Sequence, residues 1–139
     1  MSLTHIQITT HGEKFYNITE EVKKALATTR KDSESGVLTL FVQHTSCALT
    51  INESFDPSAA EDMENFLKHL APRNLKFIKH DDEGPDDSPS HMKSILLQTS
   101  IQIPVDQKEI LLGRWQGIYL CEFRDSPKER RVLIKYQAD

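Results

Sequence analysis

The spacing of apolar residues divides the first part of the chain into strands and helices. Residues 2–10 alternate between apolar and polar side chains, which is typical of a half-buried strand near a sheet edge. Residues 37–42 are almost continuously apolar and predict a central strand that is buried on both faces. Short strands are predicted at residues 48–51 and 75–78, and the second of these ends just before His80.

Two stretches in the same half have the spacing of amphipathic helices. Thr19 is a typical N-cap residue, and the acidic residues after it favour a first turn, which predicts a helix over residues 20–30. A second helix is predicted to begin at Asp56-Pro57-Ser58 and to end before Pro72. Its expected buried stripe consists of Met63, Phe66, Leu67 and Leu70.

The remainder of the chain predicts one helix followed by strands. Ser88-Pro89 indicates a helix start, and the inward stripe of this helix is expected to be Met92, Ile95 and Leu96. Strands joined by short turns are predicted over residues 101–105, 110–112, 115–123 and 132–136. An irregular alternation followed by a run of strands indicates an α+β fold with about three helices, in a single domain over residues 1–139.

Composition excludes several functional classes. The net charge of -4 argues against nucleic acid as a partner, because phosphate binding requires clustered Lys and Arg. No apolar run approaches the roughly 20 residues of a membrane span, and the N-terminal residues lack a signal-peptide pattern. The two isolated cysteines, Cys47 and Cys121, predict no disulfide framework, so a cytoplasmic location is expected.

The most polar stretch, residues 80–91, places five carboxylates between His80 and His91. Acidic runs of this kind are usually solvated. If these carboxylates instead crowd a cleft, their repulsion raises some of their pKa values unless a metal ion neutralises them. A magnesium ion held there could bridge to a substrate phosphate.

Three histidines, His44, His80 and His91, are predicted at the ends of different elements. They could converge on one divalent ion and leave a position open for water or substrate. Imidazole suits zinc, nickel or iron, whereas magnesium or manganese would suit the carboxylates of Asp56, Asp82, Asp86 and Asp87. The spacing matches no standard zinc motif, so the alternative is three separate polar residues at loop ends.

Further candidates lie in the middle and at the end of the chain. Ser46 or Cys47 beside His44 could form a nucleophile–base pair, although no nucleophile-elbow glycines surround them and Cys47 is expected to be buried. Asn52-Glu53 could orient a histidine or bind substrate hydroxyls, or simply cap a strand. Adjacent Arg130-Arg131 point to opposite faces of a strand, so one of them can reach a phosphate or carboxylate.

Four motifs together resemble the YjbQ-like family. They are His44 to Glu53, Asp56-Pro57, residues 80–91 and Gly113-Arg114-Trp115-Gln116, in the family's order, and the likeness runs from about residue 37 to residue 136. The resemblance implies a barrel-like β-sandwich of mixed sheets, a homotrimer and a metal-capable site. It also implies secondary thiamine-phosphate synthase activity, which joins a pyrimidine methyl diphosphate to a thiazole phosphate and releases diphosphate.

The residues and the resemblance together give an expected site for a small phosphorylated molecule. The expected ligands of a divalent metal, zinc or magnesium, are His44, His80 and His91. Catalytic roles are expected for Ser46, Asn52, Glu53, Asp56, Asp86 and Asp87. Substrate contacts are expected for Thr45, Trp115, Gln116, Arg130 and Arg131. The alternative function is a trimeric protein that binds a metal or small anion without turnover.

The chain departs from the family pattern at four positions. Gln98 and Lys108 stand where glycine is usual and are expected to change turn geometry. Ala60 replaces a common arginine and Arg114 a usual threonine, which is expected to move a positive charge around the site or at a subunit contact. These differences bear on the substrate range rather than on the fold.

Overall fold

The computed structural model describes residues 2–29 and 33–139. In these residues the elements follow the order β1 (Ser2–Thr10), β2 (Lys14–Asn17), α1 (Thr19–Thr28), β3 (Gly36–Val42), β4 (Cys47–Glu53), α2 (Pro57–Leu70), α3 (Asp87–Leu96), β5 (Ser100–Asp106), β6 (Glu109–Ile110), β7 (Gln116–Glu122) and β8 (Lys128–Ala138). The predicted α+β class is confirmed, with three helices in the described part of the chain. None of these helices is long and apolar enough to cross a membrane.

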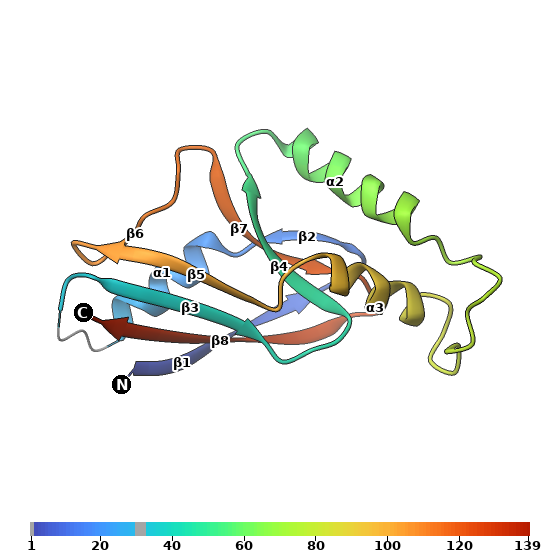
Figure 1. Cartoon of the computed structure of the whole chain (residues 1–139), viewed down its shortest axis with the longest axis horizontal. Helices are drawn as coiled ribbons and strands as arrows, with labels where there is room; N and C mark the ends of the chain where they lie inside the picture. The colour runs from blue at the N-terminus through green and yellow to red at the C-terminus, as the bar shows by residue number, and fades with distance from the viewer. Residues whose placement is uncertain (1, 30–32) are drawn as a thin grey trace.

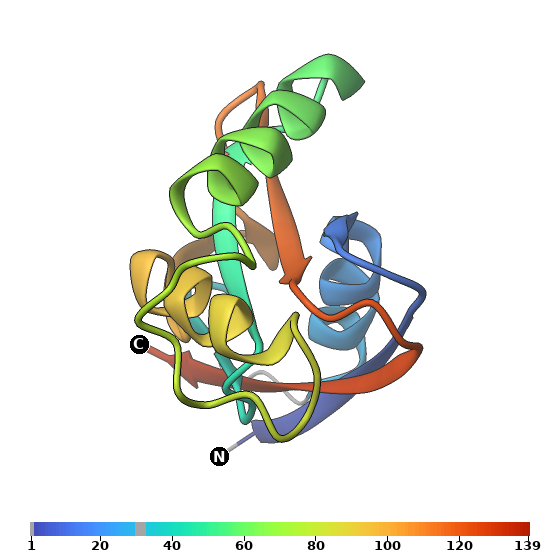
Figure 2. The ribbon, with the colours of Figure 1, turned by 90° about the vertical axis from the view of Figure 1, so that its right-hand side faces the viewer.

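Two sheets form the body of the molecule (Figure 1). The five-stranded sheet has the order β1-β8-β3-β5-β6, and the three-stranded sheet has the order β2-β7-β4. The strand pairs are antiparallel, and β1 lies at a sheet edge as predicted. Figure 2 shows β4 and β7 rising from the larger sheet, with α1 on one side of them and α3 on the other. This half-barrel arrangement fits the expected barrel-like fold.

The main core lies between the five-stranded sheet, α1 and the inner face of β4 and β7. On β3, Leu38, Leu40 and Val42 are buried in it, whereas Phe41 on the other face is 42% exposed. The prediction that this strand is buried on both faces is therefore wrong for the single chain, since its outer face is only partly covered at Val37 and Thr39 and is exposed at Phe41. The strand buried on both faces is β7, whose Ile118 belongs to the main core while Tyr119 packs in a second cluster.

Helix α1 buries its apolar stripe of Val22, Ala25 and Leu26, whereas α2 buries less of its predicted stripe. Asp56 caps α2 as expected by accepting a hydrogen bond from the Ser58 N–H, but Leu67 is the only buried residue of this helix. Phe66 and Leu70 are exposed, because α2 projects away from the sheets (Figure 1).

The third helix, α3, begins at Asp87 and turns a polar face inward. Its buried residues are Asp87, Pro89, Ser90, Lys93 and Ser94. The predicted inward stripe is therefore wrong: Ile95 is 82% exposed and Leu96 is 54% exposed. The charged residues on the buried face have partners on other elements, and these partners are what allow the polar face to point inward.

Two local predictions also differ from the structure. Residues 75–78 form turns rather than a strand, so His80 is carried by the loop between α2 and α3.

Strand β2 was not predicted. Thr19 is the first residue of α1 rather than its N-cap, and its hydroxyl accepts a hydrogen bond from the Ile118 N–H. The predicted end of that helix at residue 30 lies outside the described residues.

The turn before β6 keeps a glycine-like conformation at Lys108, although the side chain is lysine. Lys108 has a φ of 66°, which is the left-handed region that costs most side chains about 1 kcal/mol or more. Gln98, by contrast, forms an extended bridge with Leu49 and needs no such conformation. The expected change of turn geometry is therefore absent at Lys108.

Lys108→Gly is expected to raise the free energy of unfolding by roughly 0.5–1 kcal/mol, because glycine adopts the left-handed conformation without strain. The matched control is Gln98→Gly, which should lower stability, because it adds backbone freedom at a strand-like position. Urea unfolding of both variants measures the difference. Equal effects of the two substitutions, or a loss of stability in Lys108→Gly, would contradict this interpretation of the turn.

Candidate functional site

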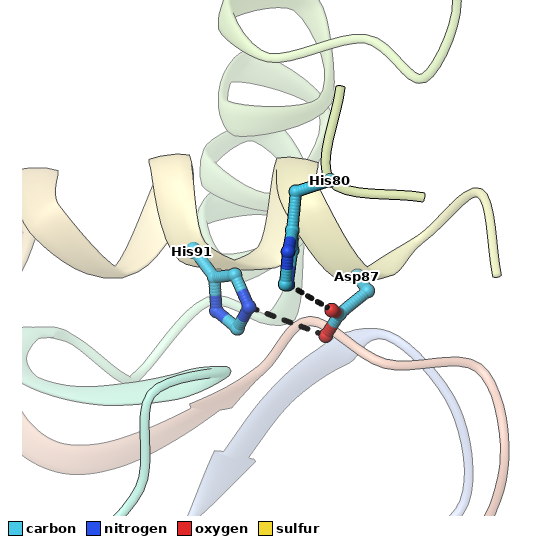
Figure 3. A group of neighbouring side chains, drawn as sticks. All are labelled: His80, Asp87 and His91. Atoms are coloured by element: carbon cyan, nitrogen blue, oxygen red, sulfur yellow. Dashed lines mark ion pairs between the residues drawn. The ribbon is translucent and has the colours of Figure 1, made fainter. Parts of the chain in front are cut away.

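Three side chains converge where the loop before α3 meets the first turns of that helix. Asp87 and His91 are four residues apart and therefore share one face of α3. The His80 Nε2 atom lies 2.9 Å from Asp87 Oδ2, and the His91 Nε2 atom lies 3.3 Å from Asp87 Oδ1. Figure 3 shows both imidazoles pointing toward the Asp87 carboxylate. One ligand atom from each residue lies within 4.8 Å of the others, so they could hold one metal ion.

The orientation of His91 is set by its second ring nitrogen. Its Nδ1 lies 2.7 Å from the Thr45 carbonyl oxygen, which can only accept a hydrogen bond, so Nδ1 carries the proton. In the neutral imidazole, the Nε2 lone pair then faces the Asp87 carboxylate, and the two electron-rich groups repel each other. A second proton on His91, or a cation between the two groups, removes this repulsion. Metal-binding histidines in general have their other nitrogen held in this way.

Arg124 fixes the acidic loop and Asp87 from behind. Its Nε donates to Asp86 Oδ2 at 3.0 Å, and its Nη1 donates to Asp87 Oδ1 at 2.8 Å. Its Nη2 donates to the Glu83 carbonyl at 2.9 Å. Burial opposes the charge of Asp86, but hydrogen bonds from the Asp125 N–H and from Arg124 hold the pKa of this carboxyl below its usual value. Asp86 is therefore an ionised anchor rather than a proton donor.

Sequence reasoning missed Arg124. In sequence it is a single arginine just after a strand. Only the folded structure, which places it opposite the acidic loop, identifies it as a site residue.

A second buried ion pair lies beneath Ser46 and His44. Arg130 donates through Nε and Nη2 to the two carboxylate oxygens of Glu122, at 2.8 and 2.6 Å, and Glu122 is fully buried. Arg130 Nη2 also donates to Ser46 Oγ at 2.8 Å. The predicted opposite orientation of the two arginines is observed, since Arg131 is exposed. Arg130 is thus buried, and its hydrogen bonds to Ser46 fix the position of that residue.

The environment of Ser46 and Cys47 does not activate either as a nucleophile. The Ser46 hydroxyl accepts from Arg130 and is buried, with no histidine partner among the described contacts. Burial raises the pKa of the Cys47 thiol to about 12, so the thiolate is scarce at neutral pH. These contacts give no support to covalent catalysis by either residue, and the catalytic role expected for Ser46 stays a prediction.

His44 lies in the same pocket as His80 and His91 but outside their close cluster. The pocket has a volume of about 830 Å³ and is lined by His44, Thr45, His80, His91, Ser94, Ile95, Leu97 and Thr99. The Nε2 of His44 accepts a hydrogen bond from the Arg131 N–H at 2.9 Å, so this nitrogen is occupied. Asp87, rather than His44, completes the close cluster with His80 and His91, and the ligand role expected for His44 stays a prediction.

The other predicted residues gather at the far end of β4. Seven strand residues at about 3.3 Å each separate the two ends of β4 by roughly 20 Å. Glu53 Oε2 accepts hydrogen bonds from the backbone N–H groups of Phe55 and Asp56, and Asn52 Oδ1 accepts from the Glu53 N–H. The Ser58 N–H, which Asp56 caps, lowers the pKa of the Asp56 carboxyl. Within one chain these residues do not join the histidine cluster.

The same end of the sheet carries an exposed aromatic pair. Trp115 is 46% exposed and meets Phe55 edge to face, with ring centroids 5.0 Å apart. The Arg114 guanidinium lies over the Trp115 ring at 4.7 Å. Gln116 uses Oε1 to accept from the Gly113 N–H at 2.8 Å, which closes the turn before β7. Trp115 therefore lies at the surface rather than in the core, and its expected substrate contact stays a prediction.

His44 is expected to stay neutral below its ordinary pH range, because burial and the nearby Arg130 charge lower its pKa and outweigh the opposing effect of Glu122. The unfolded chain then takes up a proton near pH 6.5 before the folded chain does, so stability falls as pH drops below about 6.5. An NMR titration should place the His44 midpoint below about 6.5, with His44→Gln identifying the signal. A midpoint at or above the ordinary value would contradict this.

Comparison with known proteins gives matches over most of the chain. A family model described as UPF0047 protein YjbQ-like matches residues 4–139. UPF0047 protein YjbQ of Escherichia coli O157:H7 is 42% identical over 125 residues, which make up 90% of this chain and 89% of that protein. UPF0047 protein sll1880 of Synechocystis is 35% identical over 132 residues, which make up 95% of this chain and 88% of that protein.

Solved structures agree with the fold. A conserved hypothetical protein from Thermus thermophilus has a TM-score of 0.84 and 36% identity, covering 96% of this chain and 99% of that chain. A YbjQ-like protein of unknown function from Sulfolobus solfataricus has a TM-score of 0.85 at 20% identity, covering 99% of this chain and 98% of that chain, and shows likeness of fold alone. The names of these relatives specify no substrate or metal. The chain belongs to the YjbQ-like UPF0047 family.

Proposed function

We propose that this protein is a cytoplasmic metal-dependent enzyme that acts on a small phosphorylated molecule. The observation that carries the proposal is the convergence of His80, Asp87 and His91, whose ligand atoms lie within 4.8 Å of one another. Two imidazoles and one carboxylate suit zinc or a similar divalent ion and leave a coordination position for substrate. The free cysteines, Cys47 and Cys121, are compatible with a reducing compartment.

The donor set fits a cation on electrostatic grounds. The Asp87 side chain is 3% exposed, and it faces the Nε2 atoms of both histidines. Arg124 supplies one positive partner but reaches only one of the carboxylate oxygens. Magnesium prefers a fuller set of oxygen ligands, so zinc is the first metal to test. A bound divalent ion would neutralise phosphate charge and stabilise a departing diphosphate.

The chain's own residues would position the substrate around that ion. Among the described lining residues of the pocket there is no Lys or Arg, so a phosphate gains little positive charge from the wall itself. The Thr45 carbonyl fixes the His91 ring, and Arg124 fixes Asp87. The exposed Ile95 and half-buried Leu97 offer an apolar wall that excludes water from one side of a bound substrate.

A homotrimer is part of this proposal. The exposed Phe55 and Trp115 rings, and the uncovered Phe41 on β3, are large apolar groups that association would bury. Light scattering of the purified protein tests the assembly directly.

The finer proposal is thiamine-phosphate synthase activity, in which a pyrimidine methyl diphosphate and a thiazole phosphate are joined. The alternative is a trimeric protein that binds a metal or small anion without turnover. The capping hydrogen bonds of Glu53 and Asp56 at the far end of β4 favour this alternative, because they assign those carboxylates a local structural role.

Asp87→Asn and His91→Ala are each expected to weaken zinc binding by about 100-fold or more, because each removes one ligand. Arg124→Gln should weaken it by about tenfold, since it only positions Asp87. His69→Ala on α2 is the matched control and should change nothing. Competition with a chromogenic chelator measures the affinities. Equal affinity in wild type and in Asp87→Asn would remove the basis of the proposed site.

Product formation separates the enzyme from the binding protein. Zinc-loaded wild type should form thiamine phosphate from the two precursors, and His91→Ala should lose this activity by about 100-fold or more. Glu53→Gln tests whether the far end of β4 takes part, because a catalytic carboxylate cannot be replaced by an amide. Normal zinc affinity without product formation would support the non-catalytic alternative and would set aside the synthase reaction.

A further inference from the structure

A second pocket lies apart from the histidine cluster and shares no lining residue with its pocket. We call it the Lys93 pocket, lined by Glu13, Lys68, Arg73, Lys93 and Asp125 together with the Ala71-Pro72 turn, and its volume is about 530 Å³. Four separate segments of the chain contribute to it. None of its charged residues was singled out by sequence reasoning.

The pocket contains a lysine whose ammonium group is almost fully buried. The Lys93 side chain is 2% exposed, and its Nζ donates to Glu13 Oε2 at 2.6 Å. The Phe123 ring lies 5.9 Å from the same nitrogen. An ammonium group has three N–H donors, and Glu13 is its one acceptor among the described residues. Lys93 therefore retains hydrogen-bond donors for a ligand in the pocket.

The other cations of the pocket are Arg73 and Lys68. Arg73 pairs with both carboxylate oxygens of Asp125 at 2.6 Å and reaches Glu13 Oε1 at 3.4 Å. Hydrogen bonds from Arg73 lower the pKa of Asp125, so this acid stays ionised and holds Arg73 in place. Lys68 is exposed at the end of α2. Three cations and two carboxylates leave one net positive charge on the pocket.

A purely structural role explains this arrangement less well. The Lys93–Glu13 pair does tether α3 to the turn before β2. A buried ion pair is nevertheless often no more stabilising than well-packed apolar residues. Tethering also does not require an ammonium group that faces a hollow of about 530 Å³ beside two further cations. An oxyanion matches both the free donors and the positive charge of the pocket.

We propose that the Lys93 pocket is a second binding site, for the carboxylate or phosphate oxyanion of a small metabolite. The Lys93 ammonium forms the floor of this site, and Arg73 and Lys68 form its wall. The site is distinct from the proposed metal centre, since the two pockets share no lining residue.

The test is an NMR titration of the full-length, metal-stripped protein with inorganic phosphate and, separately, with acetate. At least one of the anions should shift the amide signals of Glu13, Arg73 and Lys93. The double variant Glu13→Gln/Lys93→Met removes the pair without leaving a lone buried charge, and it should weaken binding by about tenfold. Lys76→Met, at an exposed lysine outside the pocket, is the matched control and should bind as wild type does.

Two further variants keep the test decisive. Lys68→Met changes only an exposed wall residue and should weaken binding by about threefold even if the double variant folds poorly. His91→Ala should leave anion binding unchanged, which separates this site from the metal centre. Phosphate binding tighter than acetate binding identifies a phosphate ester as the ligand class, and the reverse order identifies a carboxylate. The proposal is overturned if neither anion shifts these signals, or if Lys68→Met and the double variant bind as wild type does.

Discussion

The buried carboxylate of Asp87 is the constraint on which the candidate site depends. A charge at 3% exposure requires partners, and it has one in Arg124, while the imidazoles of His80 and His91 face it and stabilise it only when they carry a proton or share a cation with it. Arg124 also donates a hydrogen bond to Asp86, which fixes the end of the loop between α2 and α3. His80, earlier in the same loop, contacts Asp87. The helix start, the loop and the end of β7 are thus arranged around one negative charge.

The fold could be predicted where the local pattern and the tertiary environment agree. Strands β1 and β5 alternate apolar and polar residues and face the core as expected, because only one side of each can be buried. The prediction failed at α3, where Ile95 is exposed and Lys93 is buried. Its polar face points inward because Glu13 and Arg124 supply partners from distant segments, and no local pattern encodes such partners.

The site could be predicted only in part for the same reason. The two ends of the acidic stretch, His80 and His91, were identified because histidines flanking carboxylates are a recognisable composition. Asp87 was expected in a catalytic role or as one of several carboxylates for magnesium, and its position between the two histidines suits the ligand role. His44 was expected in the cluster, but the Arg131 N–H occupies its Nε2. Arg124 was missed because, in sequence, a single arginine after a strand looks like a solvated residue.

The central claim is that one divalent ion binds between His80, Asp87 and His91. Anomalous diffraction from a zinc-soaked crystal, recorded on both sides of the zinc edge, tests it most directly. A zinc ion bound there gives a peak about 2 Å from the Nε2 atoms of both histidines and from an Asp87 oxygen. The absence of a peak there, or a peak only beside the exposed carboxylates of Asp81 and Asp82, would contradict it.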